Sequence, residues 1–215
     1  MLSNLLTKIS GFIGNKKIAF TVFTLSACAG IIIFSGYKDG PAANGKTVTG
    51  APFNNDKTCS SCHSGSDYGS SVSTQLLDAG NNPVSIYNPG QNYTFKITVS
   101  ETTVDPVEFG FQTTCATTVA STNINKWGTL PVGTQNIKKK QRNYVEHSVP
   151  QATNIFSIPW KAPSAGTGSV TFYTAANVVN GNNKNTKDDP TDPATLVVAE
   201  ATAKAPVAFN NVKGE

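Results

Sequence analysis

The stretch Asn92–Ser100 has the sequence NYTFKITVS, in which apolar and polar residues alternate. Its apolar positions are Tyr93, Phe95, Ile97 and Val99. Successive side chains of a strand point to opposite faces of a sheet, so this period of two predicts a strand with one buried face. The turn signal Pro89-Gly90 comes shortly before it.

Further stretches have the β-branched and aromatic composition of short strands. They are Val72–Leu77, Val84–Tyr87, Val107–Cys115, Asn143–Val149, Asn154–Trp160, Gly168–Val179 and Ala194–Ala199. Segments rich in Asn, Gly and Pro separate them. Seven or eight short strands at this spacing predict an all-β fold, an antiparallel β-sandwich of the immunoglobulin type.

Composition supports one folded domain. The chain has 215 residues, which predicts one β-rich domain of about 150 residues. Its 11 Phe, 6 Tyr and 2 Trp argue against a disordered chain. Residues 1–35 contain no acid and hold Lys8, Lys16 and Lys17, which are three of the 17 basic residues. Residues 36–215 contain the other 14 basic residues and all 13 acidic ones. This nearly balanced charge argues against nucleic-acid binding.

Residues 18–34, IAFTVFTLSACAGIIIF, form an uncharged apolar run directly after Lys16-Lys17. This order is typical of export, because the apolar run enters the bilayer while the lysines stay in the cytoplasm. Three outcomes stay open: cleavage at Ala27-Cys28-Ala29 or near Ser35-Gly36, lipidation of Cys28 in the lipobox-like Leu25–Cys28, or retention as a tether. We therefore expect residues 1–35 to be a signal peptide or membrane anchor.

The rest of the chain is expected to have three parts. Residues 36–58 contain four Gly and two Pro, which predicts a linker. Residues 59–200 are expected to form the sandwich domain, and residues 201–215 a C-terminal tail.

The sandwich domain begins with Cys59-Ser60-Ser61-Cys62-His63, the C-x-x-C-H pattern of covalent c-type haem attachment. Two thiols at this spacing reach the two vinyl groups of one porphyrin edge, and the next imidazole then lies under the iron. The sequence thus predicts Cys59 and Cys62 as thioether anchors of one haem c and His63 as its proximal axial ligand. Three alternatives stay open: a thioredoxin-like redox pair, a zinc site completed by Cys115 and His147, or a local disulfide.

The amino-acid composition limits the candidates for the second axial ligand. The only methionine is Met1 and the only other histidine is His147, so His147 is the candidate distal ligand. A lysine, a tyrosine, an open site or a purely structural His147 remain alternatives. Two histidines favour electron transfer, whereas an open site favours gas binding or peroxide chemistry.

No other motif assigns catalytic residues: G-x-S-x-G, H-E-x-x-H and phosphate-binding glycine loops are absent from the sequence. Two charged clusters are expected to be solvated loops, Lys138–Arg142 and Lys187–Asp192. The basic one is an alternative site for an acidic redox partner or for the haem propionates. Cys115 is expected to be buried and inert.

Several short motifs, in order, resemble the bacterial Reeler-like domains known as choice-of-anchor V proteins. They are Gly50–Pro52, Thr58–Gly65, Tyr87–Tyr93, Phe109–Gln112, His147-Ser148, Trp160–Pro163, Gly168–Tyr173 and Ala176–Gly181. The resemblance covers about residues 50–182. It implies an immunoglobulin-like sandwich, export, and a bound haem c in members with C-x-x-C-H.

These observations lead to a functional hypothesis: an exported monohaem c-type protein of a Gram-negative bacterium, in the periplasm, membrane-anchored or at the cell surface. Its role would be electron transfer or redox sensing with an unidentified partner protein. The alternatives are an extracellular binding or adhesion module with a structural C-x-x-C, and haem-based peroxide or gas chemistry.

Overall fold

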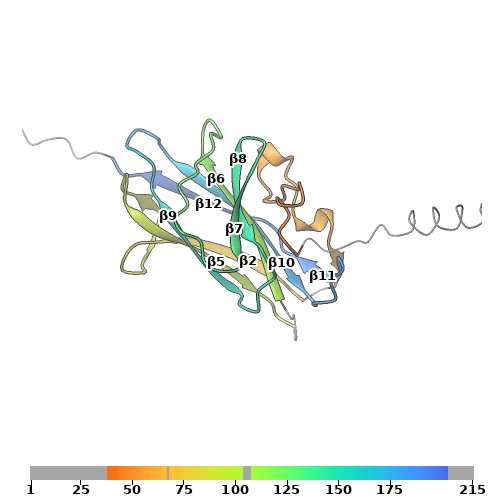
Figure 1. The fold of residues 1–215 in the computed structure, drawn as a ribbon. Coiled ribbons are helices and arrows are strands. Elements are labelled where there is room, and N and C mark those ends of the chain that lie inside the picture. Colours follow the sequence, from red (N-terminus) through yellow and green to blue (C-terminus); the bar gives the residue numbers. More distant parts are fainter. Residues whose placement is uncertain (1–37, 67, 104–107, 203–215) are drawn as a thin grey trace, which may run out of the picture. The chain divides into compact units, whose positions relative to one another are not determined.

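The computed structural model describes residues 38–202 except 67 and 104–107 (Figure 1). The apolar run 18–34, Cys28 and residues 203–215 lie outside the described residues. Within the described ranges, no helix has the length and apolar character needed to cross a bilayer.

Two sheets make up the described part of the chain (Figure 1). The smaller has the order β3-β2-β5-β9, formed by Pro83–Val84, Ser71–Leu77, Asn92–Ser100 and Ile155–Lys161. The main path of the larger is β1-β11-β10-β6-β8-β7, formed by Ser64–Gly65, Thr186–Pro190, Val170–Val179, Glu108–Thr117, Arg142–His147 and Thr134–Lys139. The same sheet includes β12 (Ala194–Glu200), which pairs with β10, and β4 (Ile86–Tyr87), which pairs with β12. Short 3₁₀ turns η1 (Pro52–Asn54) and η2 (Cys59–Ser61) precede the strands.

The β-sandwich predicted from the sequence is confirmed. Strand β5 spans the same residues as the predicted strand, and the pairs are antiparallel except β1–β11 and β4–β12. The stretch predicted at 84–87 is divided into β3 and β4, which join different sheets. Strands β1, β7 and β11 were not predicted, because each is short, polar and at or near a sheet edge.

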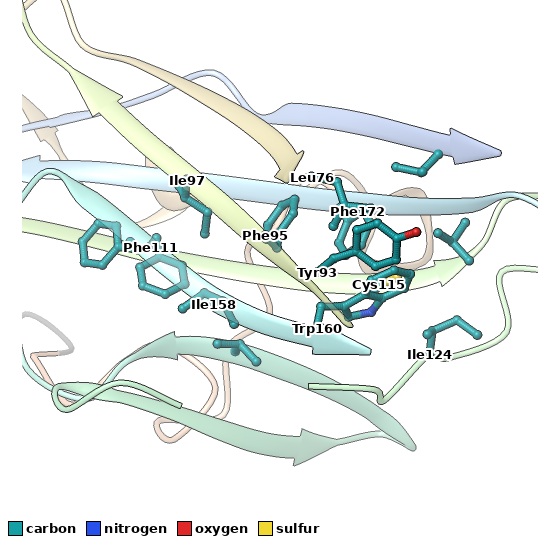
Figure 2. Packing of buried hydrophobic residues seen from close by; sticks show 14 of the residues in the cluster. Leu76, Tyr93, Phe95, Ile97, Phe111, Cys115, Ile124, Ile158, Trp160 and Phe172 are labelled. Atoms are coloured by element: carbon teal, nitrogen blue, oxygen red, sulfur yellow. The ribbon is translucent and has the colours of Figure 1, made fainter. Parts of the chain in front are cut away.

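Aromatic side chains fill the space between the sheets (Figure 2). Phe95 of β5 stacks on Phe172 of β10 with ring centroids 4.3 Å apart, and Trp160 of β9 meets Phe172 edge-on at 5.1 Å. Phe111 and Phe156 form a second contact across the sheets at 4.5 Å. Such pairs add to the burial of apolar area, so this layer fixes how the sheets face each other.

Strands β6 and β10 are buried along nearly their whole length, unlike β5, which alternates. Their inner faces contact the core. Residues 38–58, which we call the cover segment, contact their outer faces, with Val48 bonded to Gln112 of β6 and Phe53 against Tyr173 of β10. Ala42, Val48, Thr49 and Ala51 of this segment are all at most 5% exposed. The structure therefore differs from the expected linker at residues 36–58: the described part of that stretch packs on the sheet.

Polar side chains of the larger sheet hold the cover segment. Glu146 of β8 accepts hydrogen bonds from the backbone amides of Ala42 (2.7 Å) and Ala43 (3.0 Å), and Gln112 of β6 accepts one from Val48 (2.6 Å). Gln112 also donates to Glu146 through Nε2 (2.7 Å). Burial raises the pKa of Glu146, while these donors oppose the rise. Backbone amides at Ala42, Ala43 and Val48, which lie in no strand or helix, thereby have acceptors.

Replacing Glu146 by Ala should release the cover segment. The change leaves the buried amide of Ala42 and the partly buried amide of Ala43 without their acceptor, at a cost of roughly 1–3 kcal/mol. We expect a lower midpoint in urea unfolding and faster tryptic cleavage after Lys46 and Lys57. The exposed Asp192→Ala serves as the charge-matched control. Equal proteolysis of both variants would contradict the role given to Glu146.

Candidate functional site

One pocket is lined by residues from widely separated parts of the chain. Its lining comes from the cover segment, η2 and the residues after it, β6, β8, β10 and the turn after β10. The empty volume is ≈ 790 Å³, counting space open to solvent.

The C-x-x-C-H segment forms a tight turn on one side of the pocket. The amides of Cys62 and His63 both donate to the carbonyl of Cys59 (3.0 Å each). Asn185 then holds the turn from the far end of the chain by donating through Nδ2 to the Cys62 carbonyl (2.6 Å). Cys59, Cys62 and His63 all line the pocket.

His63 is oriented by a buried carboxylate. Its Nδ1 lies 2.7 Å from Oδ2 of Asp188, whose side chain has no exposed surface. A carboxylate accepts only, so Nδ1 carries a proton, and in the neutral ring the lone pair is therefore on Nε2. That tautomer is the one in which His63 can bind a metal through Nε2.

An irregularity in β11 accompanies the inward position of Asp188. Strand β11 pairs in parallel with β1, and Ser64 and Gly65 face Thr186 and Asp188, so Lys187 is an extra residue. Lys187 has φ 60, in the left-handed region that side chains seldom adopt. A bulge of this kind re-aims the next side chain, and here that residue is Asp188.

His147 ends strand β8 and lies where the β6–β8 ladder opens. The ladder pairs Gln112 with Glu146 and Thr113 with Val145, and the chains meet again only at the Phe109–Gln151 bridge. In the gap, Nδ1 of His147 is 3.0 Å from the amide nitrogen and 3.1 Å from the carbonyl oxygen of Phe111. The imidazole thus takes the place of a strand partner.

Gly110 makes room for this imidazole. A Cβ at position 110 would lie 2.8 Å from Cε1 and 3.0 Å from Nδ1 of His147. Both residues line the pocket, so the absence of a side chain at 110 lets the ring lie against the backbone of β6.

All four haem-site residues named from the sequence line this one pocket: Cys59, Cys62, His63 and His147. The strand order places β10 and β6 between β11, which carries the partner of His63, and β8, which carries His147. Three strand spacings separate β11 from β8, about 14 Å at the usual spacing. The two histidines therefore lie on either side of β10 and β6, and both line the pocket.

Basic residues at the pocket differ from those expected. Lys38, Lys46 and Lys184 line it, with Glu108 as its one acidic lining residue. The basic cluster Lys138–Arg142 lies at the β7–β8 hairpin and does not line the pocket. An anionic group in the pocket would therefore meet the first three lysines.

The three described cysteines are free thiols, and their surroundings differ. Burial and the neighbouring Cys62 raise the pKa of Cys59 to about 12, which disfavours the thiolate that a thioredoxin-like pair uses. Cys115 lies fully buried in the core, as expected, and burial raises its pKa. No three His, Cys, Asp or Glu residues among those described are arranged to hold a metal ion, so the zinc alternative gains no support from them.

Asn177 on β10 has a buried side-chain oxygen that lacks a hydrogen-bond donor among the described residues. The residue lines the pocket and is 5% exposed, and its Oδ1 accepts no hydrogen bond from any residue that the structure describes. Its cross-strand partner is Gly110. A buried acceptor without a donor is costly, and a ligand or a water in the pocket would satisfy it.

Sequence reasoning missed Asp188, Gly110, Asn177 and the three pocket lysines as site residues. Asp188 was expected in a solvated acidic loop, since charged clusters usually are. Gly110 and Asn177 fall within two motifs of the family resemblance, Phe109–Gln112 and Ala176–Gly181, which was the available signal. The lysines are ordinary exposed residues that only the fold brings together.

Known structures resemble this fold at low similarity. The crystal structure of the human F-spondin reeler domain (fragment 1) is 20% identical, covers 65% of this chain and 92% of that chain, and has a TM-score of 0.41. The crystal structure of the Reelin-N domain of F-spondin is 18% identical, with coverage of 67% and 96% and a TM-score of 0.43. No protein-family model matches the chain, and no curated protein matches it.

The raised pKa of Cys59 predicts slow alkylation of the apoprotein. At pH 8 a thiol of pKa about 12 is ionised to about 1 part in 10⁴, so iodoacetamide should react roughly a thousandfold more slowly than with a free cysteine. The rate should keep rising between pH 8 and 10, where an ordinary thiol levels off. Site-resolved mass spectrometry measures this, with protein in urea as the control. A plateau near pH 9 in folded protein would disprove it.

Proposed function

We propose that the chain is an exported β-sandwich protein that carries one haem c and transfers single electrons. Cys59 and Cys62 would anchor the haem by thioether bonds, with His63 as proximal and His147 as distal ligand. The observation that carries this is the meeting of the C-x-x-C-H turn and His147, 84 positions further along the chain, in one pocket.

The proximal side fits an iron ligand. Asp188 holds the proton on Nδ1 of His63, which leaves the lone pair of Nε2 for a metal. The buried carboxylate also calls for positive charge on the far side of the imidazole, since a buried charge needs a partner. A ferric iron would supply that charge.

The walls of the pocket also suit an amphipathic macrocycle. Pro41, Val48, Phe111 and Val179 give apolar surface. Lys38, Lys46 and Lys184 offer cationic partners for two propionates. The pocket thus combines an apolar interior with basic residues, which a haem requires.

The distal side favours electron transfer over substrate chemistry. The Phe111 backbone holds Nδ1 of His147, and Gly110 lets the ring lie close to the sheet, so little side-chain rearrangement would accompany a redox change. Haem, when bound, supplies a one-electron redox centre. A second histidine would close the site to exogenous ligands.

An oxidising compartment outside the cytoplasm suits covalent haem attachment. The basic flank and apolar run at residues 16–34 support export to the periplasm or cell surface, with Cys28 lipidation or a retained anchor as the tether. The redox partner is expected to be another protein.

The test is a pyridine haemochrome spectrum of the full chain expressed with c-type maturation machinery. We expect one thioether-linked haem per chain, resistant to acid-acetone extraction. The double variant Cys59→Ala/Cys62→Ala should lose it, whereas Cys115→Ala should keep it. Wild-type protein without covalent haem would overturn the proposal and leave a β-sandwich binding module with a structural C-x-x-C.

Replacement of His147 by Ala should convert the haem from low to high spin and create carbon monoxide binding. Gly110→Ala should do the same to a smaller extent, because its methyl group would lie 2.8 Å from Cε1 of His147. Absorption spectra of the ferric and reduced proteins measure both. A wild-type haem that is already high spin and binds carbon monoxide would instead indicate an open distal site and gas or peroxide chemistry.

A further inference from the structure

We propose that Asp188 is a positioning residue that sets the reduction potential of the site, by holding His63 as a strongly electron-donating ligand. This rests on the proposed haem ligation by His63. The inference goes beyond that ligation because it gives Asp188, 125 positions after His63, control over the equilibrium between the oxidised and reduced states of the haem.

The contact is short, specific and enclosed. Oδ2 of Asp188 lies 2.7 Å from Nδ1 of His63, and the relative exposures of the two side chains are 0% and 16%. From the described residues, the other carboxylate oxygen accepts one long hydrogen bond, 3.4 Å, from the amide of Asn180. Most of the stabilisation of this carboxylate therefore comes from His63.

The charge of Asp188 has no other compensation nearby. Among the described residues His63 is the only one that forms an ion pair with it, and no lysine or arginine does. A buried carboxylate without a cation is unfavourable, so positive charge at His63 or beyond it is favoured. The Asp188 carboxylate would therefore stabilise an iron bound to Nε2, and the stabilisation would increase with the charge of the iron.

The backbone conformation directly before Asp188 is consistent with a specific role for this contact. The extra residue Lys187, with φ 60, occurs directly before Asp188, in the parallel pairing that joins β11 to the strand after His63. Strained non-glycine residues are found where the surrounding structure requires a particular geometry. Here that geometry brings β1 and β11 together beside the histidine.

The direction of the effect follows. A carboxylate on Nδ1 makes the imidazole a better electron donor and adds negative charge near the iron, and both stabilise the ferric state over the ferrous state. Removing the charge while keeping the shape should therefore raise the potential. Asparagine does so, because its amide oxygen can still accept a hydrogen bond from Nδ1–H of His63.

The experiment is a mediated redox titration of full-length holoprotein carrying Asp188→Asn. We expect the equilibrium to shift at least tenfold toward the reduced form, about 59 mV upward for one electron. Asp192→Asn is the matched control, because it removes the same charge from an exposed residue four positions away. It should leave the potential within a twofold change of that equilibrium.

The outcomes separate this inference from the function on which it rests. Wild-type protein without covalent haem overturns the proposed function, and this inference with it. Covalent haem with equal potentials in Asp188→Asn and wild type overturns the role of Asp188 alone. An upward shift in Asp188→Asn and none in Asp192→Asn supports it.

A second measurement does not require the Asp188 variant to fold. In reduced His147→Ala protein, the iron–His63 stretching vibration in resonance Raman spectra reports how strongly the ligand donates. We expect a higher frequency than in a haem–imidazole complex without a carboxylate partner. An equal frequency would overturn the proposal.

Discussion

The carboxylate of Glu146 lies buried on the outer face of the larger sheet and accepts hydrogen bonds from two successive amides of the cover segment. This clamp determines the path of the chain before the strands begin. Gly40 contributes by lacking a side chain, since a Cβ there, at φ +89, would lie 2.5 Å from Oε1 of Glu146. Because η2 follows the cover segment directly, the clamp also determines where the C-x-x-C-H turn can lie.

The pocket depends on this arrangement and on the order of strands in the larger sheet. One wall belongs to the cover segment, and the opposite histidines are carried by β8 and by the turn before β1. Regular pairing would have filled the space between β6 and β8 with backbone hydrogen bonds. The ladder opens instead, and Nδ1 of His147 forms a hydrogen bond with the Phe111 backbone while the residue lines the pocket. The site is thus built from interruptions in the sheet, a gap in β6–β8 and a bulge in β11.

Prediction from sequence succeeded for the strands rich in apolar and β-branched residues, and was most accurate where burial was one-sided. Strand β5 alternates between buried and half-exposed residues, and its period of two predicted its bounds. Strand β7, with the sequence TQNIKK, has a single aliphatic residue and was missed because it pairs only with β8 at the sheet edge. The cover segment was expected to be a linker because residues 36–58 contain four Gly and two Pro. Several of its contacts are made through backbone amides, those of Ala42, Ala43 and Val48, which any sequence provides, so no pattern of side chains reveals them.

The sequence by itself determined the all-β class, most of the strands, and the residue types of the candidate haem site, since alternation and a five-residue motif are local properties. Only the tertiary structure decided which groups surround that motif. Asp188 lies 125 positions from its partner His63, and Gly110 lies 37 positions from the imidazole for which it makes room. Strand order and register bring these groups together, and they follow from the packing of two whole sheets around the Phe95–Phe172 layer rather than from any short stretch of the chain.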